Sequence, residues 1–119
     1  VQFIEEHATD QTYIVLANQM VGAAAINQFG FANYYNDNFY YSMPLGNNNI
    51  YNEFLSMIED HANRDTALQA MDKTEVDKLY FVVNNYWHSA KTAINQANQT
   101  ADEHWLIDNG VNTVFVYNR

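Results

Sequence analysis

Two short apolar runs stand out along the chain and predict buried strands. They cover residues 12–17 and 79–83, and both are rich in β-branched and aromatic side chains. Apolar runs without polar alternation are typical of strands that are covered on both faces, as in parallel sheets. We therefore expect these two strands to lie in parallel at the centre of a sheet.

Apolar residues at helical spacing predict helices around these strands. A short stripe opens the chain over residues 1–8, and longer helices are expected over about 20–29, 49–62 and 89–98. Another short helix is expected to start near Asp65, where Thr66 and Gln69 have the spacing of a capping box.

The helix over 49–62 has one apolar face, formed by Ile50, Phe54 and Ile58 among others. Glu53 falls on the opposite, polar face, so we expect its carboxylate to be exposed to solvent.

Three further strands complete the expected fold. One covers 38–43, and two more, over 104–107 and 114–117, are joined by an Asn-Gly turn as in an antiparallel hairpin. The order of elements predicts a single α/β domain over residues 1–119. Its class is a three-layer Rossmann-like domain with a mixed sheet, a parallel core and a C-terminal antiparallel hairpin.

The charge balance excludes one class of partner. The chain of 119 residues has 14 acidic residues against 5 Lys and Arg, which gives a formal net charge of −9. Binding to a phosphate backbone needs clustered basic residues, so we expect no nucleic acid partner. The absence of cysteine excludes disulfides, thiolate catalysis and cysteine-based zinc sites.

The expected binding site lies where the two apolar strands end. Ligands of open α/β sheets settle beyond the carboxyl ends of parallel strands, and each strand here ends at an amide pair. Amides can bind hydroxyl groups, and a neighbouring aromatic ring can stack on a sugar ring. The residues expected to contact a ligand are Asn18, Gln19, Asn84, Asn85, Trp87 and His88. The alternative is structural: the amides cap the following helices and Trp87 covers the edge of the sheet.

Other chemistry has little support in the sequence. The four histidines lack the spacing of metal ligands, and only His88 falls at the expected site, where it could act as a catalytic group. Glycine-rich dinucleotide motifs, phosphate-binding loops and nucleophile elbows are also missing from the sequence. We therefore expect no metal and no cofactor.

Several segments together resemble a known kind of domain. They are 13–19 (Tyr-Ile-Val-Leu-Ala-Asn-Gln), 40–46, 80–87 and the closing Val-Phe-Val-Tyr strand. They resemble the soluble extracytoplasmic C-terminal domain of multi-pass prokaryotic membrane proteins of the glycosyltransferase type. The resemblance implies a non-catalytic accessory domain, excised from a larger membrane protein and placed on the extracytoplasmic face. Its implied partners are a glycan or lipid-linked sugar and the membrane portion of its own parent chain.

Three functions thus remain open from the sequence. The first is this accessory domain. The second is a small enzyme that uses His88 with a carboxylate. The third is a structural or protein-interaction module, whose aromatic cluster at 34–41 is buried against a partner.

Overall fold

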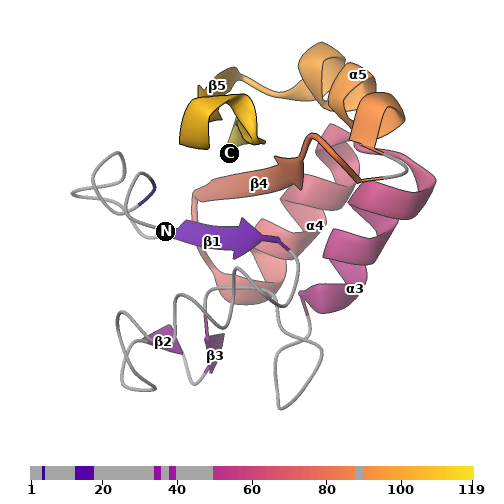
Figure 1. Cartoon of the computed structure of the whole chain (residues 1–119). Coiled ribbons are helices and arrows are strands. Elements are labelled where there is room, and N and C mark those ends of the chain that lie inside the picture. Colours follow the sequence, from indigo (N-terminus) through magenta and orange to yellow (C-terminus); the bar gives the residue numbers. More distant parts are fainter. Residues whose placement is uncertain (1–3, 5–12, 18–33, 36–37, 40–49, 88–89) are drawn as a thin grey trace.

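A four-stranded mixed sheet forms the centre of the molecule (Figure 1). The computed structural model describes residue 4 and residues 13–17, 34–35, 38–39, 50–87 and 90–119. The strands are β1 (Tyr13–Leu16), β4 (Lys78–Asn84), β5 (Glu103–Ile107) and β6 (Asn112–Asn118). They lie in the order β1-β4-β6-β5, which confirms an α/β fold with a mixed sheet.

The pairing of the strands confirms part of the expected topology. β1 and β4 are parallel, with Leu16 opposite Phe81. β6 lies between β4 and β5 and is antiparallel to both, with Phe115 opposite Phe81 on one side and His104 on the other. The C-terminal hairpin is therefore confirmed. The prediction of a parallel core holds only for the β1–β4 pair, because the hairpin folds back and inserts its second strand beside β4.

The hairpin turn requires left-handed backbone at two positions. A single 3₁₀ turn, Asp108–Gly110, joins β5 to β6. Asp108 has φ 54° and Gly110 has φ 86°. Glycine and aspartate adopt this conformation more readily than bulkier residues, so the sequence suits the turn.

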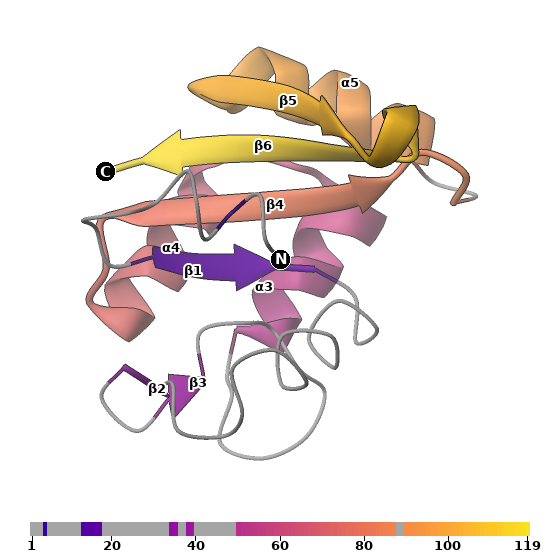
Figure 2. The ribbon, with the colours of Figure 1, turned by 60° about the vertical axis from the view of Figure 1, so that its left-hand side comes forward.

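The helices of the described part of the chain cover one face of the sheet (Figures 1 and 2). They are α3 (Tyr51–Leu55), which continues into the π-helical turn η1 (Ser56–Asp60), α4 (Arg64–Thr74) and α5 (Ala90–Thr100). Side chains on the opposite face of the sheet, such as Tyr80, are buried as well. The helix expected over 20–29 lies outside the described residues. Of the expected N-terminal stripe, the structure describes Ile4, which is helical and buried.

α4 begins at a different residue from the one expected. Its N-cap is Asn63, whose side-chain oxygen accepts a hydrogen bond from the backbone N–H of Thr66 at 2.8 Å. The capping box predicted at Thr66 and Gln69 is therefore wrong, because asparagine three residues earlier already satisfies this N–H group. The helix ends at Glu75, which is left-handed with φ 58°.

Aromatic rings connect the helices to the sheet. Phe54 of α3 contacts Phe81 of β4 with ring centroids 6.5 Å apart, and Phe81 contacts Phe115 of β6 at 6.2 Å. α5 lies against the sheet through Ala90, Ala93 and Ala97, which are all buried. Small side chains at this spacing let a helix approach a sheet closely.

A second, smaller sheet pairs β2 (Tyr34–Tyr35) with β3 (Asn38–Phe39) in antiparallel fashion. Only the first two residues of the strand expected over 38–43 are described. They pair with β2, and they are not part of the four-stranded sheet.

Candidate functional site

The amide pair at the end of β4 is built into the fold. The side chain of Asn85 donates a hydrogen bond to the carbonyl of Gly110 at 2.5 Å and accepts one from the hydroxyl of Thr113 at 2.8 Å. The backbone N–H of Asn85 donates to the carbonyl of Val111 at 2.8 Å. These bonds attach the end of β4 to the hairpin turn. A ligand would have to use the remaining N–H and lone pair of this amide.

Asn84 and Trp87 shape the same loop. The Asn84 side chain accepts a hydrogen bond from the backbone N–H of Tyr86 at 2.9 Å, which forms a local turn. Trp87 is half-buried and makes an edge contact with Phe54, with ring centroids 6.4 Å apart. Tyr86 is 81% exposed. Asn84 therefore closes a local turn, the ligand-binding role stays a prediction, and Tyr86 adds an exposed ring to this loop.

The remaining predicted site residues cannot be placed relative to this loop. Asn18, Gln19 and His88 lie outside the described residues. The parallel pairing of β1 and β4 does bring the carboxyl ends of both strands to the same side of the sheet. The enzyme hypothesis built on His88 therefore stays a prediction.

The described part of the chain shows neither a metal-binding cluster nor a histidine paired with a carboxylate. No group of three or more His, Asp or Glu residues there could hold a metal ion. His61 and His104 are both exposed, and within the described ranges neither is hydrogen-bonded to a carboxylate. The ring of His104 lies 6.2 Å from that of Phe115.

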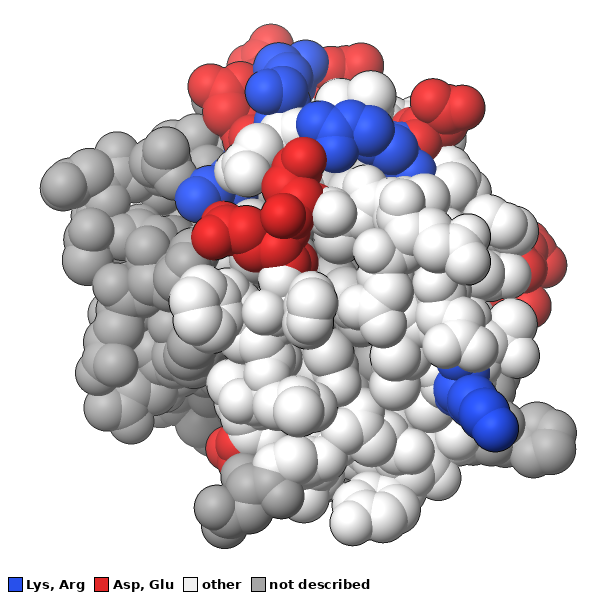
Figure 3. Space-filling view, turned by 90° about the horizontal axis from the view of Figure 1, so that it is seen from above, with Lys and Arg blue, Asp and Glu red and all other residues white. Residues whose placement is uncertain are grey.

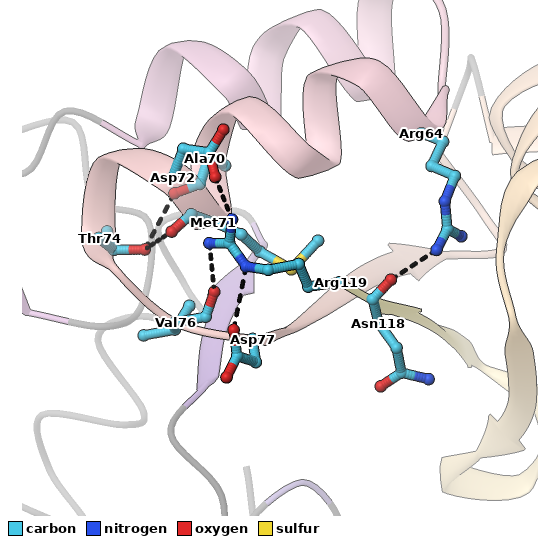
Figure 4. Close-up of polar contacts among 9 residues, drawn as sticks. All are labelled: Arg64, Ala70, Met71, Asp72, Thr74, Val76, Asp77, Asn118 and Arg119. Carbon is cyan, nitrogen blue, oxygen red and sulfur yellow. Dashed lines mark hydrogen bonds and ion pairs between the residues drawn. The ribbon is translucent and has the colours of Figure 1, made fainter.

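Two arginines, Arg64 and Arg119, connect the end of the last strand to α4 and the loop after it (Figure 4). Arg64 of α4 donates to Asp102 at 3.0 Å and to the carbonyl of Asn118 at 2.5 Å. Asp102 also accepts the backbone N–H of Asn118 at 2.7 Å. Burial raises the pKa of Asp102, but the hydrogen bonds from Asn118 and Arg64 and the charge of Arg64 outweigh it, so the net pKa is lowered.

Arg119 makes the second attachment. Its guanidinium contacts the carboxylates of Asp72 and Asp77 and donates to the carbonyl of Val76 at 2.9 Å. The hydrogen bond from its guanidinium to Asp72 contributes most to raising its pKa. These contacts hold the end of β6 against the loop between α4 and β4.

A buried carboxylate is the residue that the sequence interpretation placed wrongly. Glu53 was expected on the exposed face of its helix, but its side chain is 5% exposed and contacts the Lys73 ammonium group at 2.5 Å. Its other oxygen, Oε2, is buried and has no hydrogen-bond partner among the described residues. The expectation failed because the partner comes from α4, which packs beside α3. No pattern within the helix itself could have shown this.

The most distinctive surface of the sheet is its β5 edge. β1 and the central residues of β4 and β6 are buried, whereas Glu103 to Leu106 of β5 are all exposed. Leu106 is 69% exposed and Trp105 is 42% exposed. Because side chains alternate between the faces of a sheet, these two residues present apolar surface on both sides of the same strand.

Charge near β5 lies at its two ends, whereas its centre is uncharged. In the view from above, charged side chains leave a broad uncharged area (Figure 3). The exposed residues of α5 include the uncharged Thr92, Asn95, Asn98 and Gln99. An exposed edge strand with an apolar centre between acidic ends resembles a binding surface more than an ordinary solvated face.

The charge of Glu103 on this edge strand affects the pKa of Tyr80 in β4. It shares a row of the ladder with Val116 and Tyr80, so its charge lies on the same face as the tyrosine. Burial, and after it the charge of Glu103, raise the pKa of Tyr80 to about 12.

No family model, curated protein or solved structure matches this chain. Within the described residues, no helix combines the length and apolar character needed to cross a bilayer. Function is therefore inferred from the residues themselves.

Proposed function

We propose that this chain is a non-catalytic interaction domain that binds an extended segment of a protein partner along the outer edge of β5. One observation carries the proposal: β5 is the edge strand of the sheet and is exposed from Glu103 to Leu106, while the central residues of its neighbour β6 are buried. This is the interaction function that the sequence left open, with β5 in place of the aromatic cluster at 34–41.

The composition of β5 supports binding at this edge. Natural edge strands are commonly protected by central lysines, prolines or bulges, because an unprotected edge pairs with other chains. The centre of β5 is His104-Trp105-Leu106, which contains none of these protective residues. Strand addition gains main-chain hydrogen bonds, and the exposed Trp105 and Leu106 add apolar contacts.

A library of short random peptides displayed on phage tests this function. Peptides selected on the intact chain are expected to slow amide hydrogen exchange in β5. They should lose at least about tenfold in affinity for Leu106→Lys, because a charge on the edge opposes strand addition. Tyr86→Lys is the matched control, since Tyr86 is, like Leu106, a large exposed hydrophobic residue but lies in the loop after β4. Selected peptides that bind Leu106→Lys as tightly as the original chain, or that leave β5 exchange unchanged, would contradict the proposal.

A second candidate is the accessory domain that contacts a glycan or lipid-linked sugar. The exposed ring of Tyr86 beside Asn84 and Trp87 favours it, since a sugar needs a ring face and hydrogen-bonding groups. It also depends on a three-layer Rossmann-like arrangement, because that fold places ligands beyond the ends of parallel strands. Its placement outside the cytoplasm, as part of a membrane protein, remains a prediction from the resemblance.

The two tryptophans separate the two candidates. Trp87 lies in the loop after β4 and Trp105 lies in β5, so each is the single tryptophan reporter when the other is changed to Phe. A glycan bound at the loop is expected to change the fluorescence of Trp105→Phe, in which Trp87 remains. A peptide at the edge should change that of Trp87→Phe. No response of Trp87 to any glycan in a panel would leave the loop with its structural role alone.

A further inference from the structure

We infer that the segment bound by β5 has an apolar centre with a basic residue at each end. This inference rests on the proposed function and specifies its partner. The observations that carry it are the two acidic side chains that flank the apolar centre of β5.

Glu103 begins the strand and Asp108 follows its last residue, and both are exposed. In the described part of the chain, neither carboxylate forms an ion pair. The one hydrogen bond to the side chain of Asp108 comes from the amide of Asn112 at 2.8 Å. Three of the five basic residues, Arg64, Lys73 and Arg119, already form ion pairs elsewhere.

The spacing suits a short extended peptide. At a rise of about 3.3 Å per residue, Glu103 and Ile107 at the two ends of β5 lie roughly 13 Å apart, and Asp108 follows Ile107 at the start of the turn. A strand paired with β5 would place its central residues beside Trp105 and Leu106 and its ends beside the two acidic groups. Lysine or arginine at those ends would compensate both charges, whereas acidic ends would face like charge.

A second copy of this chain fits the edge poorly. If two β5 strands paired around a two-fold axis at Trp105, Glu103 of one copy would lie opposite Ile107 of the other, next to Asp108. The pairing would thus bring like charges together at both ends, between molecules that each carry a net charge of −9. Electrostatics therefore favours a basic partner over self-association.

Three synthetic peptides with a common centre test the inference. They are Lys-Val-Thr-Val-Thr-Val-Lys, the same sequence with threonine at both ends, and the same sequence with glutamate at both ends. Affinities are measured by titration with the intact chain at low and high salt. The lysine-ended peptide is expected to bind about tenfold more tightly than the glutamate-ended one at low salt, and the difference should shrink as salt screens the charges.

Glu103→Gln and Asp108→Asn together provide the matched variant. Both changes keep the side-chain size, and asparagine tolerates the left-handed backbone at position 108. In this variant the three peptides should bind with similar affinity. Equal binding of all three to the original chain would overturn the basic-ended partner but leave strand addition intact.

Two further outcomes test strand addition itself and the identity of the occupant. Failure of all three peptides to bind, with β5 amides unprotected, would overturn the proposed function itself. Concentration-dependent dimerisation through β5 in light scattering, lost in Leu106→Lys, would identify a second copy as the occupant and overturn the inference.

Discussion

Single side chains decide how the loop after β4 is built. The structural alternative predicts that the amides after β4 cap the following helix. The structure shows different partners: Asn84 accepts the N–H of Tyr86 in a local turn, and Asn85 bonds to the hairpin. The partners of Asn85 could not be predicted, because Gly110 and Thr113 are more than twenty residues further along the chain. They reach Asn85 only because β6 returns to pair with β4.

Asn85→Ala is expected to destabilise the fold. It removes the hydrogen bonds to Gly110 and Thr113 and leaves the Thr113 hydroxyl, on a residue that is 4% exposed, without this acceptor. The expected loss is about 1–3 kcal/mol in the free energy of unfolding, measured by urea denaturation. Asn95→Ala is the control, because Asn95 is exposed on α5 and its replacement should change stability by no more than about 0.5 kcal/mol. Equal stability of the two variants would show that the Asn85 amide contributes little to the fold.

At the scale of elements, periodicity predicts where helices form better than it predicts what their faces contact. The apolar stripe at Ile50, Phe54 and Ile58 correctly places a helix over most of 49–62. It gives no sign that α4 lies against the flank of α3 and buries Glu53. Similarly, the hairpin of β5 and β6 was predictable from its turn, but the order of the strands is set by tertiary packing. The sequence therefore could not show that β5 is the exposed edge.

The ion pair between the buried Glu53 of α3 and the partly exposed Lys73 of α4 gives a test of this packing. Lys73→Met leaves the Glu53 carboxylate buried without its cation, so we expect a loss of about 2–3 kcal/mol in the free energy of unfolding at neutral pH. Replacing both residues with Met should restore most of this stability, because two apolar side chains can fill the same space without a buried charge. The measurement is a double-mutant cycle by urea denaturation.

Lys91→Met is the control for the ion pair. Lys91 is exposed on α5 and forms no ion pair with the described residues, so its replacement should change stability by no more than about 0.5 kcal/mol. If Lys73→Met were equally mild, or if the double variant were as unstable as Lys73→Met, the pair would not govern the contact between the helices.

At the scale of the molecule, the few basic residues join distant parts of the chain. The chain has 14 acidic residues against 5 Lys and Arg, and many of the described acidic residues are exposed. What composition could not show is the placement of the arginines. Arg64 connects α4 to Asp102. Arg64 also connects α4 to the end of β6, and Arg119 connects the end of β6 to α4 and to the loop after it (Figure 4). Ion pairs and hydrogen bonds between residues far apart in the sequence thus hold the end of β6 against α4 and the loop after it.

The contacts of Asp102 with Arg64 and Asn118 make part of the stability depend on pH. Its pKa is lowered in the folded chain, whereas the pKa of an aspartate in an unfolded chain is about 3.9. A lowered pKa means that the folded state binds the proton less readily than the unfolded state. The stabilisation is therefore complete above the unfolded pKa and is lost as the pH falls through the folded one.

Asp102→Asn is expected to remove this contribution. Asparagine can still accept the N–H of Asn118 but has no charge for Arg64, and the pair is partly exposed, so the loss at neutral pH should be about 0.5–1 kcal/mol. Urea denaturation from neutral pH to about pH 3 should show the two stability curves converging as the pH falls. Asp60→Asn, which changes an exposed carboxylate without an ion pair among the described residues, should stay within about 0.5 kcal/mol of the original chain. A difference for Asp102→Asn that stayed constant or grew toward acid pH would mean that the Asp102 charge does not stabilise the folded chain.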